Sequence, residues 1–107
     1  MNTGARKLLI ASGLAAACAL PGWCDAATHT VKIEGMQFVP ATLTVKKGDR
    51  IVWQNKDVVP HTATAKGSFD SGSIAPDKSW SHAMAKAGSY DYVCTFHPGM
   101  KATVVVK

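Results

Sequence analysis

Short runs in which apolar and polar residues alternate recur along most of this chain. Between residues 28 and 34, Val31 and Ile33 fall on one face and Lys32 on the other, which is the period-two pattern of a half-buried strand. Similar runs predict strands at residues 43–45, 51–53, 61–65, 79–84, 89–94 and 102–106, separated by Gly and Pro. No window predicts an amphipathic helix. The pattern is typical of an all-β protein, an antiparallel Greek-key β-sandwich of about seven to eight strands.

The N-terminal 26 residues have a different composition. Arg6 and Lys7 precede 13 uncharged residues, 8–20, and small residues surround Asp25 before Ala27. This order is typical of a secretory signal peptide cleaved after Ala26, and it predicts export to the periplasm. The uncharged run would span about 20 Å as a helix, which is too short for a membrane anchor. Lipidation at Cys18 is an alternative that stays open.

The remaining residues, 27–107, are predicted to form one small domain. Two of the 12 Lys+Arg and one of the seven Asp+Glu lie in residues 1–26, which leaves this domain with a formal charge of +4. The basic residues form no run, so nucleic-acid binding is disfavoured. The sequence also lacks the glycine-rich nucleotide motifs, the GxSxG motif and the HExxH motif, which excludes several large classes of enzyme.

Cysteine usage points to a metal. Cleavage after Ala26 would remove Cys18 and Cys24 and leave Cys94 alone in an oxidising compartment. A domain of this size gains from a cross-link, but one cysteine cannot form a disulfide within the chain. A bound metal ion would both protect the thiol and supply the missing rigidity.

The residues around this cysteine support that interpretation. Cys94, His97 and Met100 follow one another at intervals of three, and His61 comes directly after Pro60 on a separate predicted strand. Taken singly, each residue commonly has a structural role: a cysteine as a buried thiol, a histidine as a surface imidazole and a methionine as a core thioether. Together, in an exported chain whose sandwich brings distant strand ends to one pole, they predict a metal site.

The donor atoms favour copper. Two imidazoles, one thiolate and a weak thioether match a trigonal copper site with a long axial methionine. Structural zinc normally takes four strong Cys or His ligands, and an iron–sulfur cluster needs several thiolates. A zinc sandwich remains an alternative, which a colourless protein after addition of copper would reveal.

Five segments add to this evidence: Met36-Gln37-Phe38-Val39-Pro40, Leu43-Thr44-Val45-Lys46-Lys47-Gly48-Asp49, Val52-Trp53-Gln54-Asn55, Pro60-His61-Thr62 and Cys94-Thr95-Phe96-His97-Pro98-Gly99-Met100. With these segments the chain resembles a known family, the cupredoxins, and in particular their short-loop plastocyanin/amicyanin type. The resemblance implies one type 1 copper ion held equatorially by His61, Cys94 and His97 and axially by Met100.

The resemblance also implies supporting roles for neighbouring residues. Asn55 would tie the loop bearing His61 to the strand bearing Cys94, and the N–H of Thr62 would donate to the thiolate. Pro98 has no N–H and cannot add a second such bond.

The function expected from these ligands is electron transfer. Four donors leave no open coordination position, so no enzymatic turnover is expected. The electron would leave through His97, where an apolar surface for transient docking of redox partners is expected from Phe96, Pro98, Gly99, Val58, Val59 and Pro60. The positive charge suggests a partner with an acidic rim, and the domain is expected to be a monomer. Periplasmic copper storage or delivery is the alternative function.

Several other residues carry smaller expectations. A mature chain beginning Ala27-Thr28-His29 could form a second, square-planar Cu(II) site at its N-terminus. His82 is expected to have a structural or surface role. Predicted core or packing residues are Met36, Met84, Trp53, Trp80 and Phe38.

Overall fold

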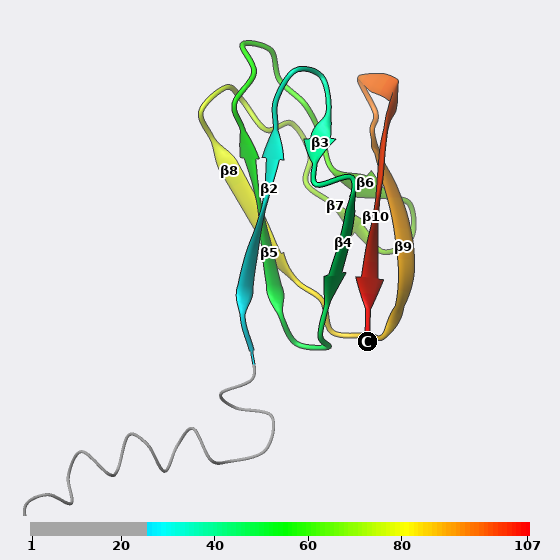
Figure 1. Cartoon of the computed structure of the whole chain (residues 1–107). Coiled ribbons are helices and arrows are strands. Elements are labelled where there is room, and N and C mark those ends of the chain that lie inside the picture. The colour runs from blue at the N-terminus through cyan, green and yellow to red at the C-terminus, as the bar shows by residue number, and fades with distance from the viewer. Residues whose placement is uncertain (1–25) are drawn as a thin grey trace, which may run out of the picture.

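The computed structural model describes residues 26–107, so the predicted signal peptide lies outside the described residues except for Ala26. Two β-sheets face each other across a core, as Figure 1 shows. The strands are β2 (Thr28–Ile33), β3 (Phe38–Val39), β4 (Thr42–Val45), β5 (Arg50–Asn55), β6 (Thr64–Ala65), β7 (Phe69–Asp70), β8 (Ser79–Ala83), β9 (Gly88–Cys94) and β10 (His97–Val106). The described part of the chain contains no helix that is long and apolar enough to cross a membrane.

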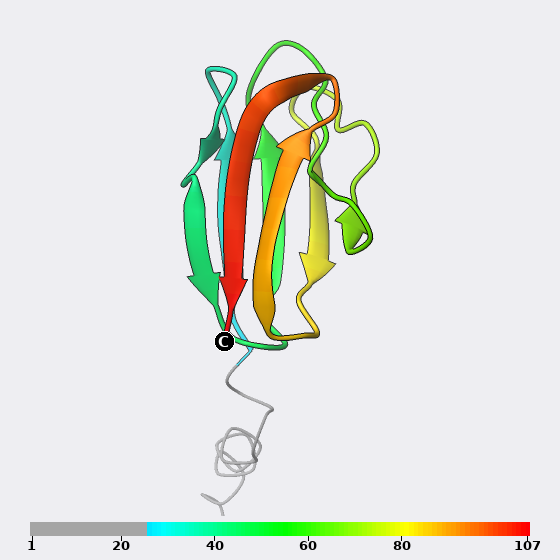
Figure 2. The same ribbon diagram turned by 90° about the vertical axis from the view of Figure 1, so that its right-hand side faces the viewer.

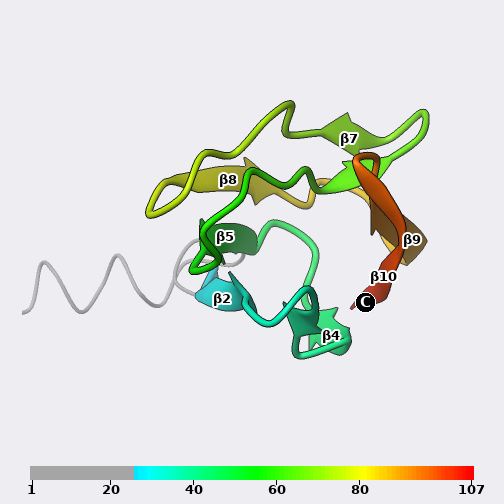
Figure 3. The same cartoon turned by 90° about the horizontal axis from the view of Figure 1, so that it is seen from above.

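The predicted sandwich is confirmed, but its sheets are mixed and not purely antiparallel. One sheet has the order β4-β10-β9-β6-β7 and the other the order β3-β2-β5-β8. β2 pairs in parallel with β5, and β4 pairs in parallel with β10. These pairs arise because the chain crosses between the two layers before it returns to a neighbour, an arrangement that is visible from the side and from above (Figures 2 and 3). Local periodicity carries no signal for such crossings.

The alternating residues form the core as expected. Val31, Ile33, Ile51 and Trp53 are all fully buried, and Trp53 packs edge-on against Tyr92 of the opposite sheet with ring centroids 5.6 Å apart. Phe38 and Met84 are also buried, and the partly buried Trp80 packs against the core. Burial of these side chains is the main source of stability in a domain of this size.

The prediction for Met36 is wrong. Its side chain is 42% exposed. The residue has a positive φ of 61° in the turn between β2 and β3, where its N–H donates to Asp57 Oδ2 at 3.0 Å. A residue at the tip of such a turn points away from both sheets, so the apolar side chain of Met36 lies on the surface.

Two predicted strands differ from the observed ones by more than two residues at one end. Only Thr64 and Ala65 of the run 61–65 lie in a strand, whereas His61 forms an isolated bridge with Ile74. The last strand begins at His97 and not at residue 102, because His97 pairs with Cys94 before a shift in register that ends at Lys101. Both departures concern the predicted metal ligands.

Candidate metal centre

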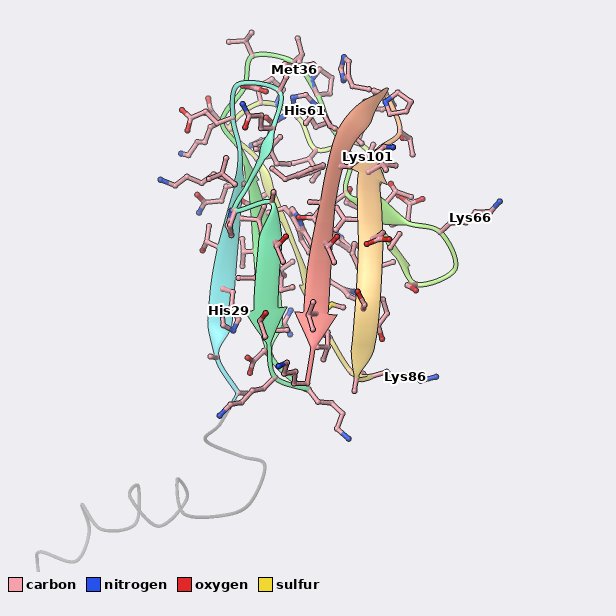
Figure 4. All side chains as sticks on the ribbon, turned by 45° about the vertical axis from the view of Figure 1, so that its right-hand side comes forward. His29, Met36, His61, Lys66, Lys86 and Lys101 are labelled. Atoms are coloured by element: carbon pink, nitrogen blue, oxygen red, sulfur yellow. The ribbon has the colours of Figure 1, made fainter. Side chains whose placement is uncertain are left out.

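Three predicted ligands converge at one end of the sandwich. The Nδ1 or Nε2 atoms of His61 and His97 and the Sγ atom of Cys94 all lie within 4.8 Å of one another. His61 lies near the same end of the molecule as the turn bearing Met36 and far from His29 (Figure 4). The sequence separates His61 from Cys94 by 33 residues, so the sandwich itself brings these atoms together.

His61 is held rigidly on both its backbone and its ring. Its N–H donates to Ile74 O at 3.2 Å and its carbonyl accepts from Ile74 N at 2.7 Å. The side chain is fully buried, and Nε2 donates to Asp57 Oδ2 at 2.8 Å. Because the carboxylate accepts a hydrogen bond from Nε2–H, the ring proton stays on Nε2 and Nδ1 carries the lone pair, and Nδ1 lies 3.6 Å from Cys94 Sγ.

Cys94 is the last residue of β9 and is fully buried. The N–H of Thr62 donates to its Sγ atom at 3.3 Å, which is the bond that the resemblance implied. Such a bond stabilises a thiolate, and it fixes the direction in which the remaining lone pairs point. The sulfur therefore faces the two imidazoles.

His97 opens β10 in a tight turn after Cys94. Its Nδ1 lies 3.8 Å from Cys94 Sγ, and its ring centroid is 5.3 Å from that of His61. Unlike His61 it is only half-buried, while Pro98 and Gly99 beside it are exposed. Met100, three residues further on, is 6% exposed and lies within the register shift of the β9–β10 ladder. His97 and Met100 therefore lie three residues apart at the irregular start of β10, directly after the turn that follows Cys94.

Asn55 supports the His61 loop by a different route from the expected one. Its Nδ2 donates to Val59 O at 2.8 Å and to Ile74 O at 2.9 Å, and its Oδ1 accepts from Asp57 N at 2.9 Å. These contacts close the loop upon itself and join it to the segment containing Ile74. None of them reaches β9, so Asn55 does not provide the expected link to the cysteine strand.

The link to the cysteine strand is made by the Thr62 side chain. Thr62 Oγ1 accepts from the N–H of Thr95 at 2.8 Å and lies 3.1 Å from Thr95 Oγ1. Thr62 thus holds the strand end through its hydroxyl and the sulfur through its N–H. The family resemblance implied the second contact, whereas the first was not expected from the sequence.

Asp57 is a site residue for which no role was expected from the sequence. Besides His61, its carboxylate accepts from Gly35 N at 2.7 Å and from Met36 N at 3.0 Å. Partial burial alone would raise the pKa of Asp57, but the hydrogen bonds from Met36, His61 and Gly35 outweigh it and lower the pKa. An ionised carboxylate thus joins the β2–β3 turn to the buried histidine. The four-residue spacing to His61 was the available signal.

The donors of the expected N-terminal Cu(II) site make other contacts in the structure. His29 Nε2 lies 2.8 Å from Asp49 Oδ2, and Ala27 N donates to Asp49 Oδ1 at 2.9 Å. Thr28 and His29 also lie in β2, which pairs with β5. A square-planar chelate would require this strand end to detach. His82 has the structural role that was expected, since its ring stacks on Trp80 with centroids 5.4 Å apart.

The donor set at the metal centre fits copper. Two imidazole nitrogens and one thiolate sulfur face one another within 4.8 Å, and the buried thioether of Met100 follows three residues after His97. The site holds three strong donors and one weak one, which suits copper better than structural zinc.

Comparison with known proteins agrees with this geometry. A family model described as a cupredoxin-like domain matches residues 8–106. The amicyanin of Paracoccus versutus is 34% identical over 83 residues, covering 72% of this chain and 63% of the relative, so the match spans just under two thirds of that protein. Amicyanin-alpha of Methylorubrum extorquens is 31% identical over 77% of this chain and 74% of its own length, and the plastocyanin of Scenedesmus fuscus is 33% identical over 65% and 86%.

Solved structures show the same similarity in three dimensions. The Cu(I) form of a methionine-to-alanine mutant of amicyanin matches with a TM-score of 0.70 and 30% identity, over 75% of this chain and 82% of that one. A reduced Cu(I) form of a proline-to-glycine mutant of amicyanin has the same TM-score and coverage.

Proposed function

The chain belongs to the cupredoxin-like family, and on this basis we propose that it is an exported copper protein that carries single electrons between redox partners. The observation that carries the proposal is the group of His61, Cys94 and His97 within 4.8 Å, with the Thr62 N–H directed at the sulfur. These three side chains and Met100 would hold one copper ion. Bound copper would supply the Cu(I)/Cu(II) couple.

The contribution of the protein is a rigid set of donors. Electron transfer is fast when little has to move between the two oxidation states, and a fixed compromise geometry serves both. Asp57 and Ile74 fix His61, and Thr62 fixes Cys94, through bonds of 2.7–3.3 Å. Four donors leave no position for a substrate, so we propose a carrier and not an enzyme.

Exposed apolar side chains near His97 support transient docking of a partner at this end of the molecule. The apolar rim comprises Val58, Val59 and Phe96, whose side chains are 90%, 36% and 51% exposed. Val59 lies two residues before one ligand, and Phe96 directly before another. Small apolar faces suit partners that must separate after each transfer. The formal charge of +4 over residues 27–107 would favour partners with an acidic rim.

Electron self-exchange tests this docking face without knowledge of the partner. Mixtures of the Cu(I) and Cu(II) forms should exchange electrons at a rate that NMR line broadening measures. Val58→Lys should slow exchange about five-fold or more, because two copies would then meet charge to charge. The matched control, Ala85→Lys, places the same charge beside Lys86 at the other end of the molecule (Figure 4). Equal slowing by both variants would contradict the assignment of the face.

The central experiment is the absorption spectrum and voltammetry of the copper-loaded protein. A strong visible thiolate-to-Cu(II) band and a reversible one-electron wave are expected, and both should be lost in Cys94→Ser. Met84→Leu, which changes a buried thioether of the core, should keep them. A colourless copper-loaded protein, or rapid loss of copper to a chelator during cycling, would overturn the proposal in favour of zinc binding or copper delivery respectively.

A further inference from the structure

A buried carboxylate lies at the end of the sandwich opposite to the metal centre. Asp49 precedes β5 and is only 2% exposed. It lies beside His29, which Figure 4 places at the lower end of β2. The surrounding surface hollow is lined by Ala27, Thr44, Val45, Lys46 and Lys107 among others. None of the proposed copper ligands belongs to this region.

The carboxylate collects donors from three directions. Oδ1 accepts from the backbone nitrogen of Ala27 at 2.9 Å, while Oδ2 accepts from Lys46 N at 2.9 Å and lies 2.8 Å from His29 Nε2. The bond from Lys46, followed by those from His29 and Ala27, lowers the pKa of Asp49 from 3.8 to about 2. The lowered pKa keeps the carboxylate ionised at neutral pH, although Asp49 is buried. Within residues 26–107, its one ion-pair partner is His29, which carries charge only when protonated.

The Ala27 nitrogen is held at this carboxylate by the fold. The carbonyl of Ala27 accepts from Arg50 N at 2.9 Å, and β2 begins one residue later in register with β5. These contacts fix the backbone on the C-terminal side of the nitrogen. They need nothing from the residues that precede Ala27.

We propose that Asp49 is the receptor for the α-ammonium group of Ala27, which cleavage after Ala26 would create at this position. Hydrolysis of the peptide bond between Ala26 and Ala27 replaces one amide N–H by a charged amine with three donors. The neutral hydrogen bond to Asp49 then becomes a charge-assisted one, which is about twice as strong. Removal of the leader would thereby stabilise the folded domain. The inference rests on the export proposed above but not on copper.

The first test uses the exported protein itself. N-terminal sequencing should read Ala27-Thr28-His29, and a protein that begins at any other residue would overturn the proposal. A second gene with one glycine inserted between Ala26 and Ala27 would give a mature chain that carries the amine one residue too early. At neutral pH the chain beginning at Ala27 should melt higher than the glycine-extended chain by on the order of 4–8 °C.

The same pair in an Asp49→Asn background should show no difference in melting temperature. Equal melting temperatures of the two chains with Asp49 intact would overturn the proposal. The visible absorption of the copper-loaded protein should be the same in all four proteins, because the two sites lie at opposite ends. A failure of this inference is therefore distinguishable from a failure of the proposed function, which would appear in that spectrum.

Chemical reactivity of the amine gives a readout that does not depend on the folding of Asp49→Asn. Acylation of the α-amine by an N-hydroxysuccinimide ester should be about ten-fold slower in the folded chain than in the same chain unfolded in urea. In the glycine-extended chain the two rates should agree. An Ala27 amine that reacts as fast in the folded state as in urea would overturn the proposal.

Discussion

Replacement of Asn55 by alanine would test whether the loop that bears His61 depends on a single buried side chain. Asn55 is fully buried and makes three hydrogen bonds, to the carbonyls of Val59 and Ile74 and from the N–H of Asp57, at 2.8–2.9 Å. Alanine removes all three at once and leaves their partners behind. The backbone of Asn55 itself remains in β5.

The expected loss follows from those contacts. A hydrogen bond within a protein contributes about 1 kcal/mol net, so three bonds amount to about 3 kcal/mol. The carbonyl of Ile74 keeps its bond from His61 N, and the partners at Val59 and Asp57 are near enough to the surface to reach water. The free energy of unfolding should therefore fall by about 2–4 kcal/mol, which in a domain of this size lowers Tm by roughly 15 °C.

Two measurements would follow the change. Urea unfolding gives the free-energy difference directly, and transfer of copper to a chelator reports on the loop. Loss of a residue that orients a metal ligand typically weakens metal binding 10–100-fold, so copper transfer from Asn55→Ala should accelerate by about that factor.

Gln54→Ala is the matched control, since Gln54 is the neighbouring residue in β5 and its side chain makes none of the hydrogen bonds found within residues 26–107. It should change stability by no more than about 0.5 kcal/mol. If Asn55→Ala lost as little as this control, or released copper no faster, the proposed role of the asparagine would be refuted.

Three further variants address other contacts. Asp57→Asn removes the negative charge next to His61. Because that charge stabilises the more positive Cu(II) state, voltammetry of the variant should show a higher reduction potential. An unchanged or lower potential would contradict this. Thr62→Val deletes the hydroxyl that accepts from Thr95 N but keeps the N–H directed at the sulfur, so unfolding should cost about 1–3 kcal/mol less while the visible band stays in place. Asp49 has its pKa lowered from 3.8 to about 2 in the folded state, so it stabilises the fold above pH 3.8 and loses this effect as the pH falls towards 2. The free energy of unfolding of Asp49→Asn should consequently fall less steeply with pH over that interval than that of the unsubstituted protein. Parallel pH dependences of the two proteins would argue against this role of Asp49.

Much of the fold could be predicted from local pattern. Period-two alternation identified the buried faces of β2 and β5, because each side chain of a strand points to one face whatever lies beyond it. Residue type identified Cys94, His97 and Met100 as a group, since their spacing of three residues places them in one turn. For Met36 the same reasoning failed, because apolarity alone does not distinguish a strand from the tip of a turn.

The contacts that support the metal centre required the tertiary structure. Asp57 lies two residues after β5, and apart from its four-residue spacing to His61 the sequence does not show that its carboxylate would join Gly35, Met36 and His61. Asn55 was assigned the link to the cysteine strand that Thr62 makes. Hydrogen bonds between residues 20 or more positions apart depend on how the loops at one pole meet, which the pairing of distant strands sets.

The sequence by itself thus determined the class of fold and the chemistry of the donors, because both depend on residue type and short-range spacing. Tertiary structure decided which strands run in parallel, which histidine is buried and which is half-exposed, and where the carboxylates of Asp49 and Asp57 lie. The physical reason is that a crossing between layers leaves no periodic trace in the chain. It nevertheless sets every long-range distance at the two ends of the sandwich.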